Sequence, residues 1–476
     1  MKHPFRSLAE GTLRLRSGNR ARTRTTASRL ILVFGLFIAT GTALLMLPMS
    51  QATGVRVGVL DCLFVATSAV CVTGLSTVPL SDSFSGAGQA VILALVQFGG
   101  LGITVAGTLF LLVRRGSGSA ASEDFIAANV GRLRQARPVD VFLYSCFVVV
   151  GLELLGFIAL TYLILGMGSG AEVDLSRAMW EAAFHSVSAF CNAGFSLYPE
   201  GLVRWRDEPL ALLAVSSLTI LGGVGLMTLV NFRYFYPWRR NRLRRGRLTL
   251  QTRLCMAGTV MLLALGTLVF WVNEQEHTLE HRPWHQGLLW SFFHSAMTRT
   301  AGFNVVDNGE MGPATLLGSM IFMFVGGCPG SMAGGVKVTT VVLLGVAARS
   351  ALRRRSDLTL GGRSVSAELA NSAVMVTLLS AAVLVLAIGV LMNVELGEKA
   401  SRSELHWIAV MYEAVSAFAT VGLSTGITPM LTVPGKWIII FLMFAGRLGP
   451  LCLAIHLMRP VQTARVLFPR EEVTVG

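Results

Sequence analysis

A nine-residue motif occurs four times along the chain, with copies separated by about 110 to 120 residues, and constrains the fold more than any other feature. Each copy contains a glycine, then Leu or Phe, then Ser or Asn, and the four glycines are Gly74, Gly194, Gly302 and Gly422. We call these the filter glycines. A long and nearly constant period indicates one structural unit that is present four times.

Long apolar stretches surround every copy of the motif. The chain is 53% hydrophobic and only 14% charged, whereas soluble domains carry roughly 25% charged residues. The composition therefore excludes a soluble enzyme or a disordered binder and predicts an all-α polytopic membrane protein. We find no P-loop, nucleophile elbow or zinc-protease motif, so we expect no enzyme activity.

The hydropathy divides each unit into a spanning helix, a short amphipathic pore helix, the glycine motif as a filter loop, and a second spanning helix. The predicted segments are a basic N-terminal region at 1–29, repeat 1 at 30–113, repeat 2 at 140–232, repeat 3 at 250–348, repeat 4 at 369–458 and a tail at 459–476. Backbone that is not helical cannot face lipid and must line water or lie within protein. Four such loops predict tandem repeats around one pseudo-fourfold central pore.

The backbone of the four motifs is the candidate cation site. Glycine permits conformations closed to other residues, and rings of carbonyl oxygens can replace the hydration shell of a permeating cation. The candidate ligands are each filter glycine and the two residues before it, namely Val72, Thr73, Gly74, Asn192, Ala193, Gly194, Thr300, Ala301, Gly302, Thr420, Val421 and Gly422.

A second glycine cluster follows each motif, in the segments 99–102, 222–225, 326–330 and 446–449. Two explanations stay open: these glycines allow close packing of membrane helices, or they form further loops. The third cluster extends to Lys337 and contains five glycines and Pro329, which are expected to break any helix.

The placement of basic residues predicts the orientation. Most of the 40 Lys and Arg residues lie before Leu30, in the alternate connections 114–137, 233–253 and 349–363, and after Met458. By the positive-inside rule these segments and both termini are cytoplasmic. The cluster at 233–253 also fits anionic lipid or an acidic partner face. The net charge of +14 is thus assigned to topology, and no nucleic acid is expected.

With its four glycine motifs and the glycine clusters that follow them, the chain resembles the membrane subunit of the Trk/Ktr/HKT superfamily of potassium transporters, over residues 30 to 460. The resemblance implies a potassium-selective filter, because some plant members that transport sodium have serine in place of the glycine matching Gly74. Trk-type members usually carry two additional N-terminal helices, so the chain is more similar to the Ktr branch; a Trk-type subunit is the alternative.

The resemblance also assigns the third cluster to an intramembrane gating loop. Its matching residues are Gly326, Gly327, Pro329, Gly330, Gly334, Gly335 and Lys337, whereas Cys328 and Met332 depart from the family pattern. Arg447 lies in an apolar run, where a charge costs roughly 2.5 kcal/mol or more, and matches a pore arginine of the family. It is expected to act as an electrostatic barrier and partner of the loop, or else in an ion pair.

Other charged residues have two interpretations each. Lys337 is a second cationic element of the gate or extends to the cytoplasmic interface. Arg299 is expected to brace the third filter loop. Glu181 and Glu413 either attract cations or satisfy neighbouring groups. His185 and His294 are expected to pack rather than to bind ions.

The function implied is potassium uptake across a bacterial cytoplasmic membrane, with sodium stimulation expected for this branch. The resemblance further implies a homodimer and a cytoplasmic ring of nucleotide-binding regulatory (RCK-type) subunits, with no cofactor in this chain itself. Membrane lipids are expected partners, and K⁺ is the transported ion. A less selective Na⁺/K⁺ pathway and a non-conducting scaffold are the competing hypotheses.

Overall fold

The computed structural model describes residues 31–113, 138–167, 174–226, 228–229, 249–353, 358–360, 363–365, 367–397 and 407–457. The predicted basic N-terminal segment, the C-terminal tail and most of the basic cluster at 233–253 lie outside these residues.

The described chain is almost entirely helical. Repeat 1 contains the helix Ile31–Leu45, η1 (Pro48–Ser50), α2 (Val59–Cys71), α3 (Leu80–Ser83) and α4 (Gly86–Val113). Repeat 2 contains α6 (Pro138–Met167), α7 (Leu175–Phe190), η2 (Val203–Trp205) and α8 (Pro209–Val224). Repeat 3 contains α10 (Leu250–Asn273), α11 (Trp284–Met297), η3 (Asn308–Glu310), α12 (Pro313–Phe324) and α13 (Val338–Leu352). Repeat 4 contains α14 (Ala367–Gly397), α15 (Trp407–Ala419), η4 (Thr428–Met430) and α16 (Val433–Leu457).

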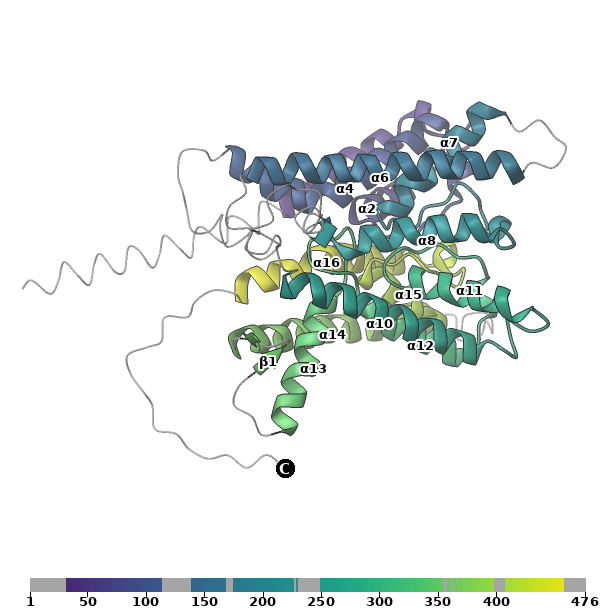
Figure 1. Cartoon of the computed structure of the whole chain (residues 1–476). Coiled ribbons are helices and arrows are strands. Elements are labelled where there is room, and N and C mark those ends of the chain that lie inside the picture. The colour runs from purple at the N-terminus through teal and green to yellow at the C-terminus, as the bar shows by residue number, and fades with distance from the viewer. Residues whose placement is uncertain are drawn as a thin grey trace, which may run out of the picture.

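Three of the described helices are long and apolar enough to cross a membrane, over Leu143–Met167, Leu250–Asn273 and Glu368–Leu396. They belong to α6, α10 and α14; α6 lies along the upper edge of the molecule in Figure 1, and α10 and α14 lie in its lower half. Only 22–28% of the residues in their most apolar windows are buried inside the isolated chain. Their apolar outer faces suit a lipid environment, as the composition predicts.

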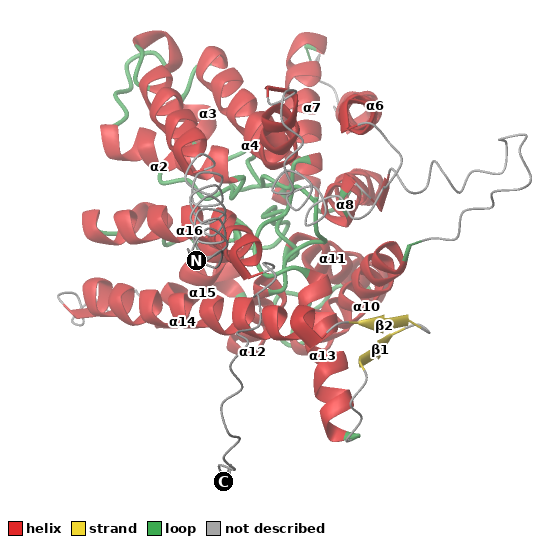
Figure 2. Cartoon of the chain, turned by 90° about the vertical axis from the view of Figure 1, so that its left-hand side faces the viewer, coloured by secondary structure: helices red, strands yellow, loops and turns green. Residues whose placement is uncertain are grey.

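The helices surround a centre that is filled by loops (Figure 2). Within each repeat the pore helix packs on its spanning helices, as in α2 with α4, α7 with α6 and α8, α11 with α10, and α15 with α14 and α16. Contacts between repeats join α4 to α6 and α7, α8 to α11, α12 to α15, and α16 to α2. The last of these contacts brings repeat 4 back to repeat 1, so the arrangement closes on itself.

Two second spanning helices differ from the hydropathy prediction. The hydropathy of repeat 3 predicts one spanning helix over 312–348, but the structure has two helices there, α12 and α13. Helix α13 runs across the direction of the others in both views (Figures 1 and 2). The hydropathy of repeat 2 likewise predicts a spanning helix over 208–232, but α8 stops at Val224, because Gly225 has a φ of +94°. A hairpin of two three-residue strands, β1 (Leu358–Leu360) and β2 (Arg363–Val365), joins repeats 3 and 4 and was not expected.

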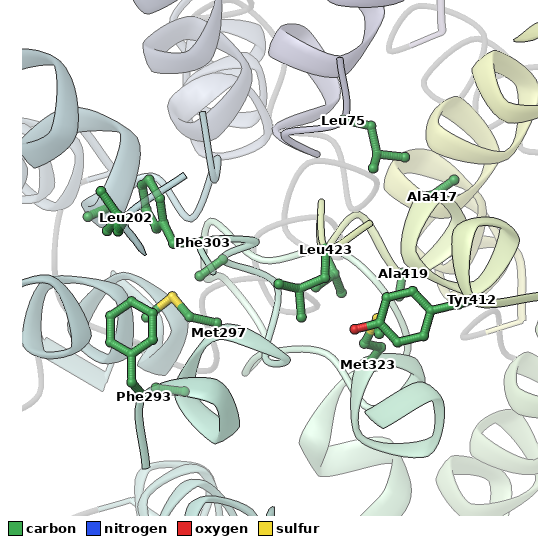
Figure 3. Packing of buried hydrophobic residues seen from close by; sticks show 14 of the residues in the cluster. Leu75, Leu202, Phe293, Met297, Phe303, Met323, Tyr412, Ala417, Ala419 and Leu423 are labelled. Carbon is green, nitrogen blue, oxygen red and sulfur yellow. The ribbon is translucent and has the colours of Figure 1, made fainter. Parts of the chain in front are cut away.

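The apolar residue after each filter glycine explains the Leu or Phe of the motif. Leu75, Phe195, Phe303 and Leu423 are each only 1% exposed. Figure 3 shows Leu75, Phe303 and Leu423 arranged around the central loops, among side chains of the pore helices such as Phe293 and Tyr412. Burial of a side chain of this size contributes about 1.5–3 kcal/mol, so these four residues anchor the loops in the core.

Candidate cation pathway

The four filter loops share one backbone conformation. The residue two before each filter glycine has a positive φ, at 56° for Val72, 58° for Asn192, 73° for Thr300 and 53° for Thr420. The filter glycines also have positive φ, at 96°, 70°, 73° and 93° in chain order, whereas the residue between does not. In an ordinary strand successive carbonyl groups point to opposite sides. When every second residue has a left-handed conformation, successive carbonyl groups point toward the same side. Such conformations cost about 1–3 kcal/mol each in residues other than glycine and cluster at functional sites.

The filter glycines contact one another in a closed cycle. A Cβ added to Gly74 would overlap the carbonyl oxygen of Ala193, and one added to Gly194 would overlap that of Ala301. A Cβ on Gly302 would overlap the carbonyl oxygen of Val421, and one on Gly422 would overlap that of Thr73. The structure thus brings all four predicted filter segments together, each against the next repeat, with no space for a side chain between them.

Serines at the start of the motif hold three of the loops. Ser68 Oγ accepts a hydrogen bond from Gly74 N, and Ser416 Oγ accepts one from Gly422 N, both at 3.0 Å. Ser188 Oγ instead donates to the carbonyl of Phe195 at 2.8 Å. The third copy has Ala296 at this position, and there Gly302 N donates to the carbonyl of Met297 at 3.3 Å. No role for these serines was predicted from the sequence, although their presence in three copies was a usable signal.

The C-terminal ends of the pore helices α2, α7, α11 and α15 lead directly into the loops. The C-terminus of a helix carries a partial negative charge of roughly half an elementary charge. Four such ends around the cycle favour a cation at its centre and disfavour an anion.

The second glycine clusters serve both of the purposes that the sequence left open. A Cβ on Gly99, Gly222 or Gly446 would overlap the carbonyl oxygen of Val70, Phe190 or Phe418, which in each case lies four residues before the filter glycine. These three glycines therefore let α4, α8 and α16 pack against the ends of pore helices. In repeat 3 the equivalent Gly326 faces the backbone of Gly334 instead, and the helix gives way to the loop 325–337.

The loop 325–337 folds back on itself and attaches to α8. Val325 and Val336 form an isolated parallel bridge, with Gly326 N donating to the carbonyl of Val336 at 2.9 Å. Three backbone bonds join the loop to repeat 2. Cys328 N donates to the carbonyl of Gly223 at 2.9 Å, Met332 N donates to that of Gly222 at 3.3 Å, and Leu226 N donates to that of Gly330 at 3.1 Å. The break of α8 at Gly225 provides these groups.

The same loop lies against the filter of repeat 4. A Cβ on Gly334 would overlap Oγ1 of Thr420, and a Cβ on Gly335 would lie 3.5 Å from the carbonyl oxygen of Ala419. Ala419 is the last residue of α15. The loop therefore lies at the C-terminal end of the pore helix α15, directly against the first residue of a filter segment.

Arg447 connects this loop to repeat 1. Its Nη1 donates to the carbonyl of Met332, and its Nη2 donates to the carbonyl of Gly99 at 2.9 Å. The residue is 3% exposed. The ion pairs formed among the described residues do not include Arg447, so its contacts are those of a loop partner rather than of an ion pair. Lys337 turns back onto the loop, where Nζ donates to the carbonyl of Ala333 at 2.6 Å.

Arg299 lies between the third pore helix and the loop. It is 6% exposed and its Nη1 lies 3.5 Å from the carbonyl oxygen of Thr259 on α10. Its guanidinium also lies near the thiol of Cys328 on the loop 325–337, so it faces both α10 and this loop. This placement fits the expected bracing role.

The buried carboxylates on the pore helices are satisfied by neighbouring groups. Glu181 accepts hydrogen bonds from Arg177 Nε at 3.0 Å and from the Tyr198 hydroxyl at 2.6 Å. Glu413 accepts hydrogen bonds from Ser424 Oγ at 2.8 Å and from Thr428 Oγ1. These contacts favour the second of the two interpretations given above for each residue. Within the described part of the chain, no group of three or more His, Cys, Asp or Glu residues is arranged to hold a metal ion.

Comparison with known proteins identifies the family. The family model described as "TrkH: Cation transport protein" matches residues 5–463. The chain belongs to the TrkH family of cation transport proteins. It is therefore a multi-pass membrane transporter and not an enzyme.

Individual relatives in this family cover almost the whole chain. The chain is 32% identical to the Ktr system potassium uptake protein B of Vibrio alginolyticus, over 98% of each protein. It is 31% identical to the potassium/sodium uptake protein NtpJ of Enterococcus hirae, over 96% of this chain and 99% of that protein. The crystal structure of the potassium transporter TrkH from Vibrio parahaemolyticus superposes with a TM-score of 0.70 at 18% identity, covering 92% of this chain and 85% of that one. The TrkH-like fold predicted from the motifs is confirmed.

Proposed function

We propose that this chain is the membrane subunit of a potassium uptake system, in which the four filter segments form a pseudo-fourfold selective pore. The observation that carries the proposal is the closed cycle of filter glycines, each packed on a carbonyl of the next repeat. One chain then supplies a complete ring of carbonyl oxygens, the arrangement that replaces the hydration shell of a cation. The ligands are the twelve backbone residues identified from the motif.

The loop 325–337 is the gate in this proposal. It lies against the filter segment of repeat 4 at Thr420 and is held by Arg447. Three features make it suitable to move: five glycines, no helix, and attachment by few backbone bonds. Arg447 and Lys337 place two positive charges beside the pathway, where they oppose cation entry while the loop is in place.

Potassium rather than sodium selectivity rests on Gly74 in the first filter segment and on the high coverage by a potassium uptake protein. A less selective Na⁺/K⁺ pathway is the second candidate, because a relative of similar coverage is described as a potassium/sodium uptake protein. In the first candidate function, potassium-selective uptake, Na⁺ is expected to stimulate K⁺ uptake.

The remaining parts of the proposal concern assembly. The similarity to a protein of a Ktr system supports a separate cytoplasmic regulatory ring that binds nucleotide, and a homodimer with one pore in each protomer. The placement of basic residues supports cytoplasmic termini. A Trk-type assembly is the alternative, since the fold also matches TrkH.

Flux into proteoliposomes that contain this chain alone tests the pore. We expect Rb⁺ and K⁺ to enter through the wild-type chain, or through a variant lacking residues 329–334, and excess Na⁺ to compete weakly. Strong competition by Na⁺ would move the assignment to the less selective pathway. Absence of flux in both proteins, with correct insertion shown by protease accessibility, would contradict a conducting pore.

Two cysteines offer a test of the gate. Cys255 on α10 and Cys328 on the loop are neighbours, and Cys328 Sγ donates to the carbonyl oxygen of Cys255 at 3.7 Å. Oxidation by copper phenanthroline, with O₂ as the electron acceptor, is expected to join them in a disulfide and fix the loop in its closed position. We expect loss of most K⁺ flux and recovery with dithiothreitol.

The Cys255→Ser variant is the matched control for this experiment, because it keeps the size of the side chain and removes the cross-link. Mass spectrometry of the disulfide-linked peptides shows whether the bond has formed. A chain that is fully cross-linked and still transports at the wild-type rate would contradict a mobile gate.

A further inference from the structure

Each filter segment is followed by a polar residue whose contacts differ between repeats. The residue two after the filter glycine is Ser76, Ser196, Asn304 or Ser424. The residue nine before the same glycine, on the pore helix, is Val65, His185, Phe293 or Glu413. Only repeats 2 and 4 therefore have a polar pore-helix residue at this position.

In repeat 4 the two positions are joined by a buried hydrogen bond. Ser424 Oγ donates to Oε2 of Glu413 at 2.8 Å and accepts from Gly426 N at 3.0 Å. Thr428 Oγ1 donates to the other carboxylate oxygen of Glu413. The side chain of Glu413 is completely buried, with 0% exposure. Its carboxylate thus connects the loop segment after the filter to α15, the pore helix before it.

Repeat 2 makes the same connection with a different residue. His185 Nδ1 lies 2.7 Å from the carbonyl oxygen of Glu181, so this nitrogen carries the hydrogen and Nε2 is left as an acceptor. Nε2 lies 3.2 Å from Ser196 Oγ, which therefore donates, and the same oxygen accepts from Tyr198 N at 3.0 Å. His185 is also 0% exposed and stacks on the Tyr198 ring, with centroids 5.0 Å apart.

Repeats 1 and 3 have no such connection among their described contacts. Ser76 Oγ donates to the carbonyl of Val78 at 2.6 Å, within its own loop. Asn304 Nδ2 donates to the carbonyl of Val306 at 3.4 Å, again locally. Val65 and Phe293 are apolar and fully buried. The two connected loops alternate with the two that lack the connection around the cycle.

We propose that His185 and Glu413 are positioning residues that fix the filter carbonyls of repeats 2 and 4, so that selectivity depends on this alternate pair of loops. The inference rests on the proposed function of the four loops as a filter. The bond sets the distance between the pore helix and the loop segment that follows the filter. It thereby fixes the position of the filter carbonyls that lie between these two elements in the chain, at Gly194 and Gly422. Loss of the bond lets the ring widen, and a wider ring discriminates less between K⁺ and Na⁺.

The chain contains its own matched set of variants: Ser196→Ala, Ser424→Ala and Ser76→Ala. Each removes one hydroxyl at an equivalent position. The readout is the ratio of K⁺ to Na⁺ permeability in proteoliposomes, which a loss of folded protein alone does not change. We expect this ratio to fall by about tenfold for Ser424→Ala, which removes a bond to a carboxylate, and less for Ser196→Ala. Ser76→Ala is expected to keep the wild-type ratio.

A second pair of variants separates the bond from the packing of the residue. Glu413→Gln keeps an acceptor oxygen and is expected to retain most of the selectivity, whereas Glu413→Leu removes both acceptors and is expected to lose it. Thermal unfolding in detergent shows that each protein is folded.

The outcomes distinguish a failure of the proposed function from a failure of the positioning role. A wild-type chain that does not select K⁺ over Na⁺ would overturn the proposed function. A selective wild-type chain with unchanged ratios in Ser196→Ala and Ser424→Ala would overturn the positioning role alone. An equal fall in all three serine variants would overturn the restriction to repeats 2 and 4.

Discussion

Replacement of Gly302 by Ala is expected to lower the initial rate of K⁺ uptake by about tenfold or more. Gly302 has a φ of +73°, and a Cβ there would overlap the carbonyl oxygen of Val421. The left-handed conformation alone costs roughly 1–2 kcal/mol in a residue other than glycine, and about 1.4 kcal/mol corresponds to a factor of ten. The overlap with backbone adds to this cost, because the neighbouring filter segment must move. Rb⁺ flux into proteoliposomes measures the effect.

Gly389→Ala is the matched control. Gly389 lies in α14, and nothing lies within 4 Å of a Cβ added there. Alanine is also the better helix former by about 1 kcal/mol, so this variant is expected to fold at least as well as the wild type and to transport normally. Normal K⁺ uptake and normal exclusion of Na⁺ by Gly302→Ala would show that the cycle of glycines does not form the filter.

The helices were largely predictable because membrane-spanning and amphipathic segments leave strong local signals. The hydropathy predicts spanning helices over 86–113, 250–272 and 434–458, close to the observed bounds of α4, α10 and α16. The breaks were less predictable: nothing in the composition of 208–232 distinguishes Gly225, with φ of +94°, from the packing glycines beside it. Its conformation depends on the loop 325–337, which is more than one hundred residues away in sequence and bonds to Leu226.

In the candidate site, too, local sequence signals were predictable and contacts between distant segments were not. The repeated motif identified the residues of the four loops because glycine is required wherever one loop packs on the next. The partners of Arg447 could not be predicted, since backbone carbonyls such as those of Met332 and Gly99 leave no trace in side-chain chemistry. The bonds that His185 and Glu413 form with serines eleven residues later could not be predicted either, because only the folded loop brings each pair close.

Replacement of Arg447 by Ala is expected to raise K⁺ flux through the chain alone by about tenfold. The change removes two hydrogen bonds, to Met332 on the loop and to Gly99 on α4. Hydrogen bonds that involve a charged group contribute about 1.5–3 kcal/mol, so the loop loses an attachment of at least a factor of ten. The positive charge beside the pathway is lost as well, which lowers the barrier to cations. Rb⁺ flux without any regulatory partner measures the gain.

Arg353→Ala is the control. Arg353 is exposed at the end of α13, and its replacement by Ala removes the same net charge. Unchanged or reduced flux in a folded Arg447→Ala protein would contradict its role in closing the pore. Arg447→Lys then separates the two contributions. Lysine keeps the charge but lacks the planar group that bridges two carbonyls. If the attachment of the loop keeps the pore closed, Arg447→Lys should conduct nearly as well as Arg447→Ala; if the charge does so, it should resemble the wild type.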